Sequence, residues 1–382
     1  MSYLLEEIRR EFPLTKECTY LNAASEAPAP LGALRVMLEI LERRKNPSRF
    51  KVAEYFDVPR RAREAAARLL GVSSETVSLT SCTGYGINMA AQGVALRPGD
   101  EILLVEGQFP ANVYPWLHAA RAAAATVRFV PAPSDVLSAG AFEQAVTPRT
   151  RVLAFDWVQF STGVRADTEG IIAMARRHSV FTVVDAAQGL GALEWRGPLP
   201  DVLAAPGHKW LLSPMGTGVL YVSDEARKHL RPPLAGWRAF LKEDSFDDLT
   251  RYDYAPPFDG RAFEVGSPPL DHFAAFASSL EYLRSVGIPA IEAHIKQIVK
   301  PILERLREAG FKVCGAEDVE ERSAIVSFER PGEDLKPLYR RLLGAGVVCA
   351  FREGRIRLAP HLYNGEDDLA RTMEVLFGAA GS

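Results

Sequence analysis

The sequence predicts an α/β fold in which a mostly parallel central sheet is covered by helices on both faces and followed by a smaller α+β domain. Short runs rich in β-branched residues alternate with segments of helical length. These runs are apolar almost throughout, which is typical of strands buried on both faces. The pattern changes after about residue 260, where the smaller domain is expected.

The expected strands of the large sheet follow one another through the first two thirds of the chain. They are "TVSLTS" (76–81), "EILLVE" (101–106), "TVRFVPA" (126–132), "RVLAFDWV" (151–158), "FTVVDAA" (181–187) and "GVLYVS" (218–223). Helices are expected over 30–44 and 59–71, before the first strand, and over 167–179, between the fourth and fifth strands. Strands separated by helices predict a mostly parallel sheet.

The last third of the chain predicts the smaller α+β domain. Helices are expected within 263–287 and over 291–310, 335–346 and 365–377, and strands over 323–329 and within 347–360. The amphipathic segment 1–13 is expected to pack against this domain. We therefore predict a large domain over residues 20–260 and a small domain made of residues 1–19 and 261–382. The region 231–270, rich in proline and glycine, joins them.

Composition limits the classes of function. The chain has 382 residues, 47% of them hydrophobic, and a formal net charge of −3 without a basic block, so nucleic acid and anionic membranes are not expected partners. No apolar run could span a bilayer, and the N-terminus lacks a signal-peptide pattern. Four scattered cysteines indicate neither a disulfide framework nor a metal site. We expect a cytoplasmic protein with a small-molecule substrate.

A candidate anion site follows the first expected strand. In "TVSLTSCTGYGINMAAQGV" a turn leads into a helix that begins near Gly84. Free N–H groups and the helix dipole favour an anion there, and Thr83 could add a hydroxyl to a bound phosphate. An ordinary capped helix explains this stretch equally well. The segment is neither a P-loop nor a GxGxxG fingerprint.

Two side chains stand at the ends of expected strands, where ligands bind in open α/β sheets. Phe109 would lie above such a ligand, although a buried core position is the commoner role of a phenylalanine. Asp185 closes a fully apolar strand, so its carboxylate would be desolvated unless a positive or protonated group meets it. It could instead cap a helix. Gln188 follows on the same turn.

Lys209 lies beside His208 in the apolar stretch "AAPGHKWLL". Desolvation would lower the pKa of this amine toward the range in which a neutral amine attacks a carbonyl. A lysine that extends to solvent from an exposed loop is the ordinary alternative. An amine, a carboxylate, a phosphate cradle and a ring clamp together are what pyridoxal 5′-phosphate requires. Their combination favours this cofactor.

The run "VVDAAQGLGAL", followed by "APGHKWLLSPMGTGVLYV", resembles the class V aminotransferase family of fold-type I pyridoxal phosphate enzymes. The family includes cysteine desulfurases, kynureninase and isopenicillin N epimerase. The resemblance extends from "YLNAASEAP" to "RIRLAPHLYNGEDDLARTMEVL" and covers nearly the whole chain. It implies the fold-type I transferase fold, an amino acid as substrate and a homodimer with shared active sites.

The resemblance also implies roles for individual residues. Lys209 would be the Schiff-base lysine, His208 would lie near the cofactor phosphate, and Asp185 would pair with the pyridinium nitrogen. Thr83 and the Gly84 amide would bind the phosphate, Phe109 would stack on the ring, and Gln188 would contact the phenolic oxygen or the imine. Gly266 and Ser267 would contact the cofactor phosphate of the partner subunit. Arg357 would bind the substrate carboxylate, and Asn22 and Ala23 would form a substrate-side wall.

The sequence departs from the family in three places. Phe109 stands where cysteine desulfurases have a histidine, and Pro206 stands where relatives commonly have a serine. Desulfurases carry a nucleophilic cysteine on a loop shortly before the carboxylate-binding arginine, whereas Cys349 lies in the apolar run "VVCAFREGRIR", which lacks that loop. The implied activity is therefore an aminotransferase, with a C–S or C–C lyase or an epimerase as the alternative. Either Gln159 or Ser161 would contact the phenolic oxygen.

Two other classes of function remain as alternatives. An NAD-type dehydrogenase would need a glycine fingerprint after a strand, and none is present. A binding protein that kept the fold without catalysis is expected to have lost Lys209, Asp185 or Arg357, and all three are present.

Overall fold

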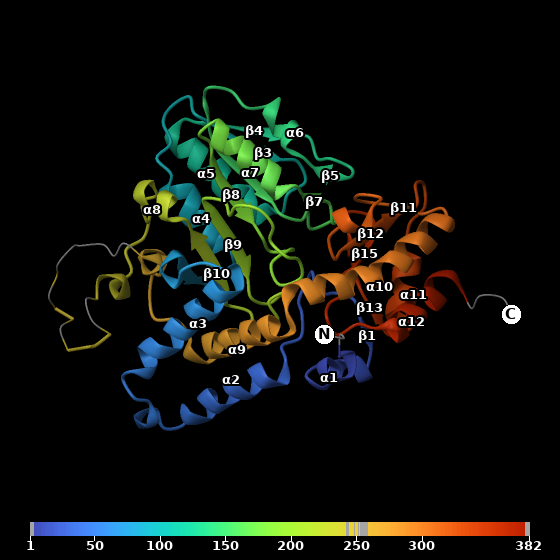
Figure 1. Cartoon of the computed structure of the whole chain (residues 1–382), viewed down its shortest axis with the longest axis horizontal. Coiled ribbons are helices and arrows are strands. Elements are labelled where there is room, and N and C mark those ends of the chain that lie inside the picture. The colour runs from blue at the N-terminus through green and yellow to red at the C-terminus, as the bar shows by residue number, and fades with distance from the viewer. Residues whose placement is uncertain (1–3, 242–243, 248, 251, 253–258, 379–382) are drawn as a thin grey trace.

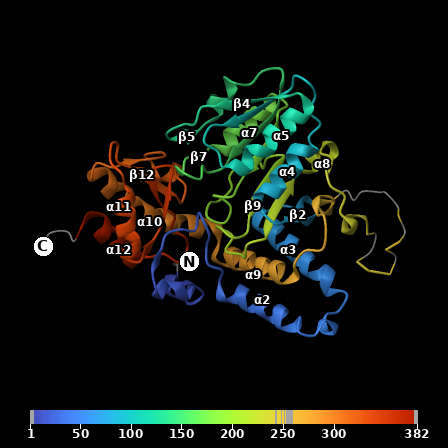
Figure 2. The same ribbon diagram turned by 180° about the vertical axis from the view of Figure 1, so that it is seen from behind.

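The computed structural model describes residues 4–241, 244–247, 249–250, 252 and 259–378. A seven-stranded sheet lies at its centre, with helices on both faces (Figures 1 and 2). In spatial order the strands are β2 (Val77–Thr80), β10 (Gly218–Val222), β9 (Val202–Pro206), β8 (Phe181–Asp185), β6 (Thr150–Asp156), β3 (Glu101–Val105) and β4 (Thr126–Val130). β10 runs antiparallel to both of its neighbours, and the other neighbouring strands are parallel, which confirms the predicted α/β class.

The six strands expected from the sequence all form, within one or two residues of their expected bounds at most ends. β9 was not among them. Its residues read "VLAAP", and alanine and proline are both poor strand formers, so the run lacks the β-branched signal of the other strands. Burial explains why it is a strand nonetheless, because all five of its residues are buried between β8 and β10.

Each face of the sheet supports its own hydrophobic core. Alternate strand residues point to opposite faces, so Ile102 and Leu104 belong to one core and Leu103 and Val105 to the other. The first core contains residues of α4 (Thr83–Gly93), α5 (Tyr114–Ala123) and α8 (Asp224–His229), and the second contains residues of α3 (Glu54–Leu70), α6 (Ala139–Glu143) and α7 (Thr168–Arg177). Burial on both faces explains the nearly continuous apolar strands.

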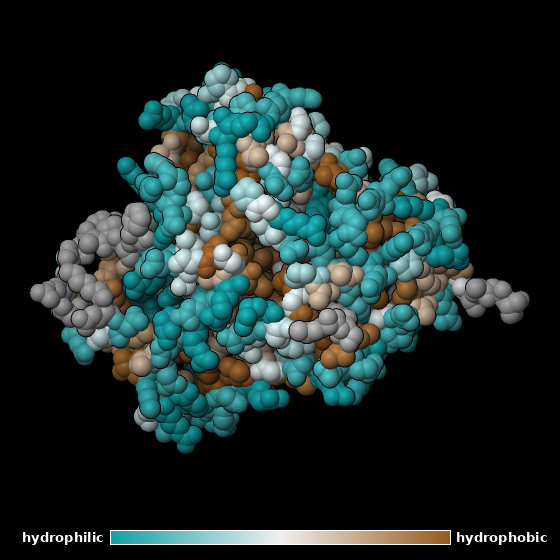
Figure 3. Space-filling view, in the orientation of Figure 1, coloured by the Kyte–Doolittle hydropathy of each residue, from teal (hydrophilic) through white to brown (hydrophobic). Residues whose placement is uncertain are grey.

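Two further helices pack beside the large sheet with α3. These are α2 (Leu31–Arg43) and α9 (Leu270–Val286), which lie side by side along the lower part of Figure 1. α3 begins at Glu54, five residues before the expected start at Pro59, and the proline lies inside the helix. Figure 3 shows apolar surface over the region of α2, whose exposed leucines are spaced three or four residues apart: Leu31, Leu34, Leu38 and Leu41.

The C-terminal part forms an antiparallel four-stranded sheet with helices. Its strands are β11 (Lys312–Val313), β12 (Val326–Glu329), β15 (Arg355–Leu358) and β14 (Ala350–Arg352), in that order, and its helices are α10 (Ile288–Glu308), α11 (Lys336–Gly344) and α12 (Glu366–Phe377). Short pairs join β1 (Thr19–Tyr20) to β13 (Val347–Val348) and β5 (Val136–Leu137) to β7 (Arg165–Ala166). No helix of the described residues is long and apolar enough to cross a membrane.

The division into a large domain over 20–260 and a small domain made of 1–19 and 261–382 stays a proposal. α9 falls in the small domain by residue number, yet it packs against α2 and α3 of the large one. This packing favours a second boundary at the start of α10.

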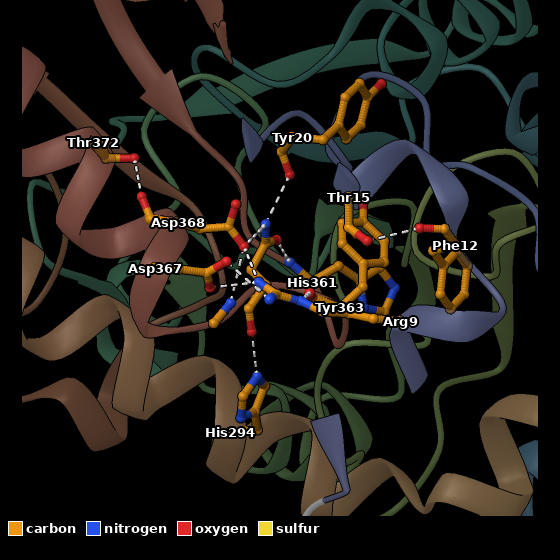
Figure 4. A network of polar contacts seen from close by, with 12 residues as sticks. Arg9, Phe12, Thr15, Tyr20, His294, His361, Tyr363, Asp367, Asp368 and Thr372 are labelled. Atoms are coloured by element: carbon orange, nitrogen blue, oxygen red, sulfur yellow. Dashed lines mark hydrogen bonds and ion pairs between the residues drawn. The ribbon is translucent and has the colours of Figure 1, made fainter. Parts of the chain in front are cut away.

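The N-terminal helix α1 (Leu5–Arg10) is bound to the small domain by a polar network (Figure 4). Arg9 Nη2 donates to Asp368 Oδ2 at 2.8 Å, and Arg9 Nε donates to the carbonyl oxygen of Tyr363 at 3.0 Å. Asn364 continues the network, since its amide donates to the Tyr20 carbonyl oxygen at 3.2 Å and its own carbonyl oxygen lies 2.7 Å from His294 Nε2. These contacts join the N-terminal segment to α12 and its preceding loop, and that loop to α10.

We predict that Arg9→Met lowers the free energy of unfolding by about 1–3 kcal/mol, because the stem can still pack while the nearly buried Asp368 loses its charged donor. Urea unfolding followed by circular dichroism measures this loss. Arg60→Met is the matched control: Arg60 makes exposed ion pairs within α3, and its replacement should cost less than about 1 kcal/mol. Equal losses in the two variants would contradict the structural role of the network.

Candidate active site

A pocket of about 390 Å³ opens where β6, β8 and β9 end and α4 begins. Eight residues predicted from the sequence line it: Thr83, Gly84, Phe109, Asp185, Gln188, His208, Lys209 and Arg357. They come from segments spread over most of the chain, so the fold is what brings them together. A larger and more open hollow, of about 840 Å³, lies between the N-terminal segment and α12 and contains none of them.

Lys209 stands on the tight turn after β9. Gly207 begins this turn, and a Cβ atom there would lie 2.0 Å from Thr217 Oγ1, so a larger residue would not fit. The Lys209 side chain is half-buried, and its amine lies 5.4 Å from the centre of the Phe109 ring. Burial lowers the pKa of this amine, and the charge of Arg357 lowers it further, against opposing effects of Asp185 and Asp156. The net effect lowers the pKa of Lys209, which shifts the amine toward its nucleophilic form.

Asp185 ends β8 and is 4% exposed. One carboxylate oxygen accepts from the Ala187 N–H at 2.8 Å. Burial raises the pKa of Asp185 to about 7, and the nearby charge of Asp156 contributes to the rise. A protonated partner stabilises the charge of such a buried carboxylate, and the protonated nitrogen of a pyridinium ring is a partner of this kind. Asp185 thus fits the role implied for it.

Asp156 is a second buried carboxylate in the pocket wall, and the sequence analysis did not single it out. It ends β6 directly opposite Asp185 in the parallel register. Burial raises the pKa of Asp156 to about 6. The signal was available in the sequence, because Asp156 interrupts the apolar run "RVLAFDWV" just as Asp185 ends "FTVVD".

The N-terminus of α4 forms the candidate phosphate end of the pocket. Its N-cap residue, Cys82, makes no side-chain cap, so the N–H groups of the first turn keep their capacity to bind an anion. A Cβ atom on Gly84 would meet nothing nearer than 3.8 Å, which leaves room at this end. His208 is half-buried beside it, and burial with the charge of Lys209 lowers the pKa of His208. A neutral imidazole is therefore expected there.

Phe109 and Gln188 border the middle of the pocket. Phe109 is 42% exposed and meets Phe160 edge to face at 5.2 Å between ring centres. The Gln188 carbonyl oxygen accepts from Trp210 Nε1 at 2.8 Å, and its amide donates to the Ala24 carbonyl oxygen at 3.0 Å. One amide hydrogen is left for a ligand. Phe109 is thus a pocket-wall residue instead of a core residue.

Gln159 and Ser161 do not line this pocket. The Gln159 amide donates to the Gly107 carbonyl oxygen at 2.7 Å, and its side-chain oxygen accepts from Ser161 Oγ at 3.0 Å. These contacts turn both side chains toward neighbouring loops. Phe160, which lies between them in the sequence, and Val158, which precedes Gln159, line the pocket instead.

Two arginines reach the pocket from the small domain. Arg357 on β15 is 2% exposed and donates to Ser25 Oγ and to the Phe160 carbonyl oxygen, both at 2.7 Å. Its Nε is buried and has no hydrogen-bond partner among the residues that the structure describes. Burial, with the charge of Arg352, lowers the pKa of Arg357 to about 10, so it stays charged at neutral pH. An arginine in this state fits a carboxylate ligand.

Four predicted residues lie outside the pocket wall. Ala24 and Ser25 line the pocket, whereas Asn22 and Ala23, two residues earlier, do not, and the substrate-side role of Asn22 and Ala23 stays a prediction. Gly266 and Ser267 also do not line it, and Ser267 is exposed. Ser25 and Arg352 were missed, because a serine in a loop and an arginine near a turn carry no signal without the fold.

The profile of the family described as Aminotransferase class-V matches residues 19–351. Among curated proteins, a probable cysteine desulfurase of Methanothermobacter thermautotrophicus is 28% identical over 98% of both chains. An uncharacterised aminotransferase, YcbU, of Bacillus subtilis is 25% identical, again over 98% of both chains.

Solved structures are similar over nearly the whole chain. An apo cysteine desulfurase from Thermococcus onnurineus NA1 has a TM-score of 0.86 at 22% identity, covering 98% of both chains. A cystine C–S lyase in complex with cysteine persulfide, its reaction product, has a TM-score of 0.86 at 23% identity, covering 96% of this chain and 98% of its own. At these identities the likeness establishes the fold.

We predict that Asp185→Asn changes how the stability of the cofactor-free protein depends on pH. Because folding raises the pKa of Asp185 to about 7, the folded wild type gains stability from this proton at low pH and loses it as pH rises through 7. The asparagine does not titrate, so the melting temperature of the variant should rise relative to wild type between pH 5 and pH 8. Ser223→Ala, which removes the N-cap of α8 and no titratable group, should lower the melting temperature by a constant difference across this pH range. A constant difference for Asp185→Asn as well would contradict the assignment.

Proposed function

The chain belongs to the class-V aminotransferase family, and on this premise we propose that it is a pyridoxal 5′-phosphate enzyme that cleaves the C–S bond of a sulfur-containing amino acid. The observation that carries the proposal is the similarity, over nearly the full length, to proteins named cysteine desulfurases. This similarity supports the lyase alternative of the sequence analysis better than the aminotransferase.

The cofactor is pyridoxal 5′-phosphate, and the pocket residues fit it. Lys209 would hold the aldehyde carbon, Asp185 the ring nitrogen, and Thr83 with the Gly84 amide the phosphate. Phe109 would cover one face of the ring. When bound, the cofactor supplies an electron sink for the pair left behind when a bond at the substrate's Cα breaks.

The chain's own residues perform the rest of the reaction. Arg357 would bind the substrate's α-carboxylate and so orient Cα toward Lys209. The Lys209 amine, released when the substrate's amine takes its place, would accept the proton from Cα, and its lowered pKa suits it to this role. Loss of this proton lets the Cβ–S bond break, with the sulfur leaving as a thiolate. The apolar walls, Val158 and Phe160 among them, exclude water from the proton-transfer site.

The hairpin before Arg357 favours elimination over transfer of sulfur to an enzyme cysteine. β14 and β15 are joined by only Glu353 and Gly354, so there is no loop to carry a thiol to the substrate. Cys349 is 3% exposed, and burial raises the pKa of its thiol to about 12. A thiol in that state is a structural one. Water would then complete the reaction, and the carbon product would be a keto acid.

An aminotransferase is the second candidate. It is favoured by the match to YcbU, which covers 98% of both chains. Transamination would use the same Lys209, Asp185 and Arg357, and would differ in returning the proton to the cofactor and in needing a keto-acid acceptor. The two candidates are therefore separated by products.

A homodimer with shared active sites and a cytoplasmic location belong to the same proposal. Gly266 and Ser267 lie outside their own chain's pocket, as expected if they serve the pocket of a partner. The row of exposed leucines on α2 offers an apolar face for a second copy. All four cysteines are free thiols, which supports a reducing compartment.

With L-cysteine, we predict pyruvate, ammonia and sulfide in equal amounts, and with L-cystine pyruvate, ammonia and cysteine persulfide, without a keto-acid acceptor. Chromatography of the products measures this. Cys82→Ala, which removes the one thiol among the described lining residues, should keep the pyruvate yield, as should the control Cys349→Ala. Alanine as product would indicate desulfuration, and dependence on an acceptor would indicate transamination.

We predict that borohydride fixes one cofactor mass on the peptide that contains Lys209, because this lysine lines the pocket. Lys209→Ala should lose this mass and reduce the rate by about 10²–10⁴-fold through loss of the base. Lys228→Ala, on the exposed α8, is the control and should behave as wild type. Mass spectrometry of peptides after reduction decides, and a colourless wild type that binds no added cofactor would contradict the proposal.

A further inference from the structure

We propose that Asp156 is a positioning residue of the active site: it holds the segment that carries Phe109 against β6 and places a second negative charge beside Asp185. The inference rests on the proposed function, since it assumes pyridoxal 5′-phosphate in the pocket. It adds a residue that no role implied by the family resemblance includes.

The first support is the register of the sheet. Asp156 and Asp185 are partners on neighbouring parallel strands, β6 and β8, which lie about 4.8 Å apart. Partners in register point to the same face, and both carboxylates line the same pocket. This end of the pocket therefore contains two carboxylates. One of them, Asp185, is enough to pair with a ring nitrogen, so Asp156 is additional.

The second support is the set of donors around Asp156. Its Oδ1 accepts from Gln108 Nε2 at 3.2 Å and from Asn112 Nδ2 at 3.0 Å, and its Oδ2 accepts from the Phe109 N–H at 3.2 Å. All three donors belong to one short segment, 108–112, and this segment includes the ring proposed to stack on the cofactor. The carboxylate thus fixes where Phe109 stands.

The orientation of the two amide side chains is determined by other contacts. The Gln108 side-chain oxygen accepts from the Val105 N–H at 2.7 Å, and the Asn112 side-chain oxygen accepts from Trp116 Nε1 at 3.3 Å. Each amide must therefore turn its NH₂ group to Asp156. Three donors from the described residues thus converge on residue 156, which is an arrangement that favours an ionised carboxylate.

The third support is the charge that surrounds Asp156. Lys209 and Asp185 are the charged groups that act on Asp156 and face the same pocket end, and Lys209 is in turn influenced by Arg357 and Arg352. His208 lies next to Lys209 and is held neutral by burial. Asp156 raises the pKa of both Lys209 and Asp185. The negative charge of Asp156 would therefore stabilise a proton on the Lys209 amine and a proton held between Asp185 and the cofactor's ring nitrogen.

The test is a pH titration of the visible absorbance of the cofactor-loaded enzyme. Asp156→Asn removes the charge and turns an N–H group toward the Phe109 N–H, so the midpoint should fall by about 1 pH unit. Asp156→Ser also removes the charge and keeps a hydrogen-bond acceptor, so it should show the same fall if the asparagine variant does not fold. Asp156→Glu, which restores the charge, should return the midpoint toward wild type.

Asp271→Asn is the control for a merely structural role. Asp271 is 3% exposed and pairs with His272 away from the pocket, so its replacement should lower the melting temperature and leave the midpoint unchanged. If the neutral Asp156 variants lose stability and keep the wild-type midpoint, the inference is wrong. If the wild type takes up no cofactor, the proposed function itself fails, and the two failures are thereby distinguished.

Discussion

Burial of charge at one end of a sheet is the constraint on which the active site depends. Asp156, Asp185 and Lys209 are brought together at the ends of adjacent parallel strands, where water is largely excluded. Each group is costly in this place by itself. Together with a protonated ring nitrogen they would compensate one another, so we expect the protein to gain stability when it binds its cofactor.

The sequence predicted the fold well because its signals are local. Apolar strands, helical periodicity and the turn at Gly207 each act over a few residues, and the large sheet formed as expected. β9 was not predicted because alanine carries no strand preference. The position of β9 between β8 and β10 depends on the whole sheet. The helix α9 lies beside α2 for the same kind of reason, since its packing is decided far from its own sequence.

The site was predicted in part for a related reason. Lys209, Asp185, Thr83 and Phe109 could be placed because each belongs to a motif near a strand end, and all of them line the pocket. Ser25 and Arg352 belong to no such motif, and only the fold of the chain brings them to the pocket. Asp156 could have been predicted, because a charged residue within an apolar run is visible in the sequence. The resemblance to the family implies no role for this residue.

The turn between β14 and β15 also limits how this enzyme could acquire a new activity. Glu353 and Gly354 both adopt left-handed conformations, with φ angles of 47° and 79°, as a two-residue hairpin requires. An insertion at this turn would change the register that holds Arg357 opposite Ala350. A sulfur-carrying loop therefore could not be added by one substitution. An evolutionary path between the two chemistries would have to rebuild the hairpin while keeping Arg357, the arginine proposed to bind the substrate carboxylate, in place.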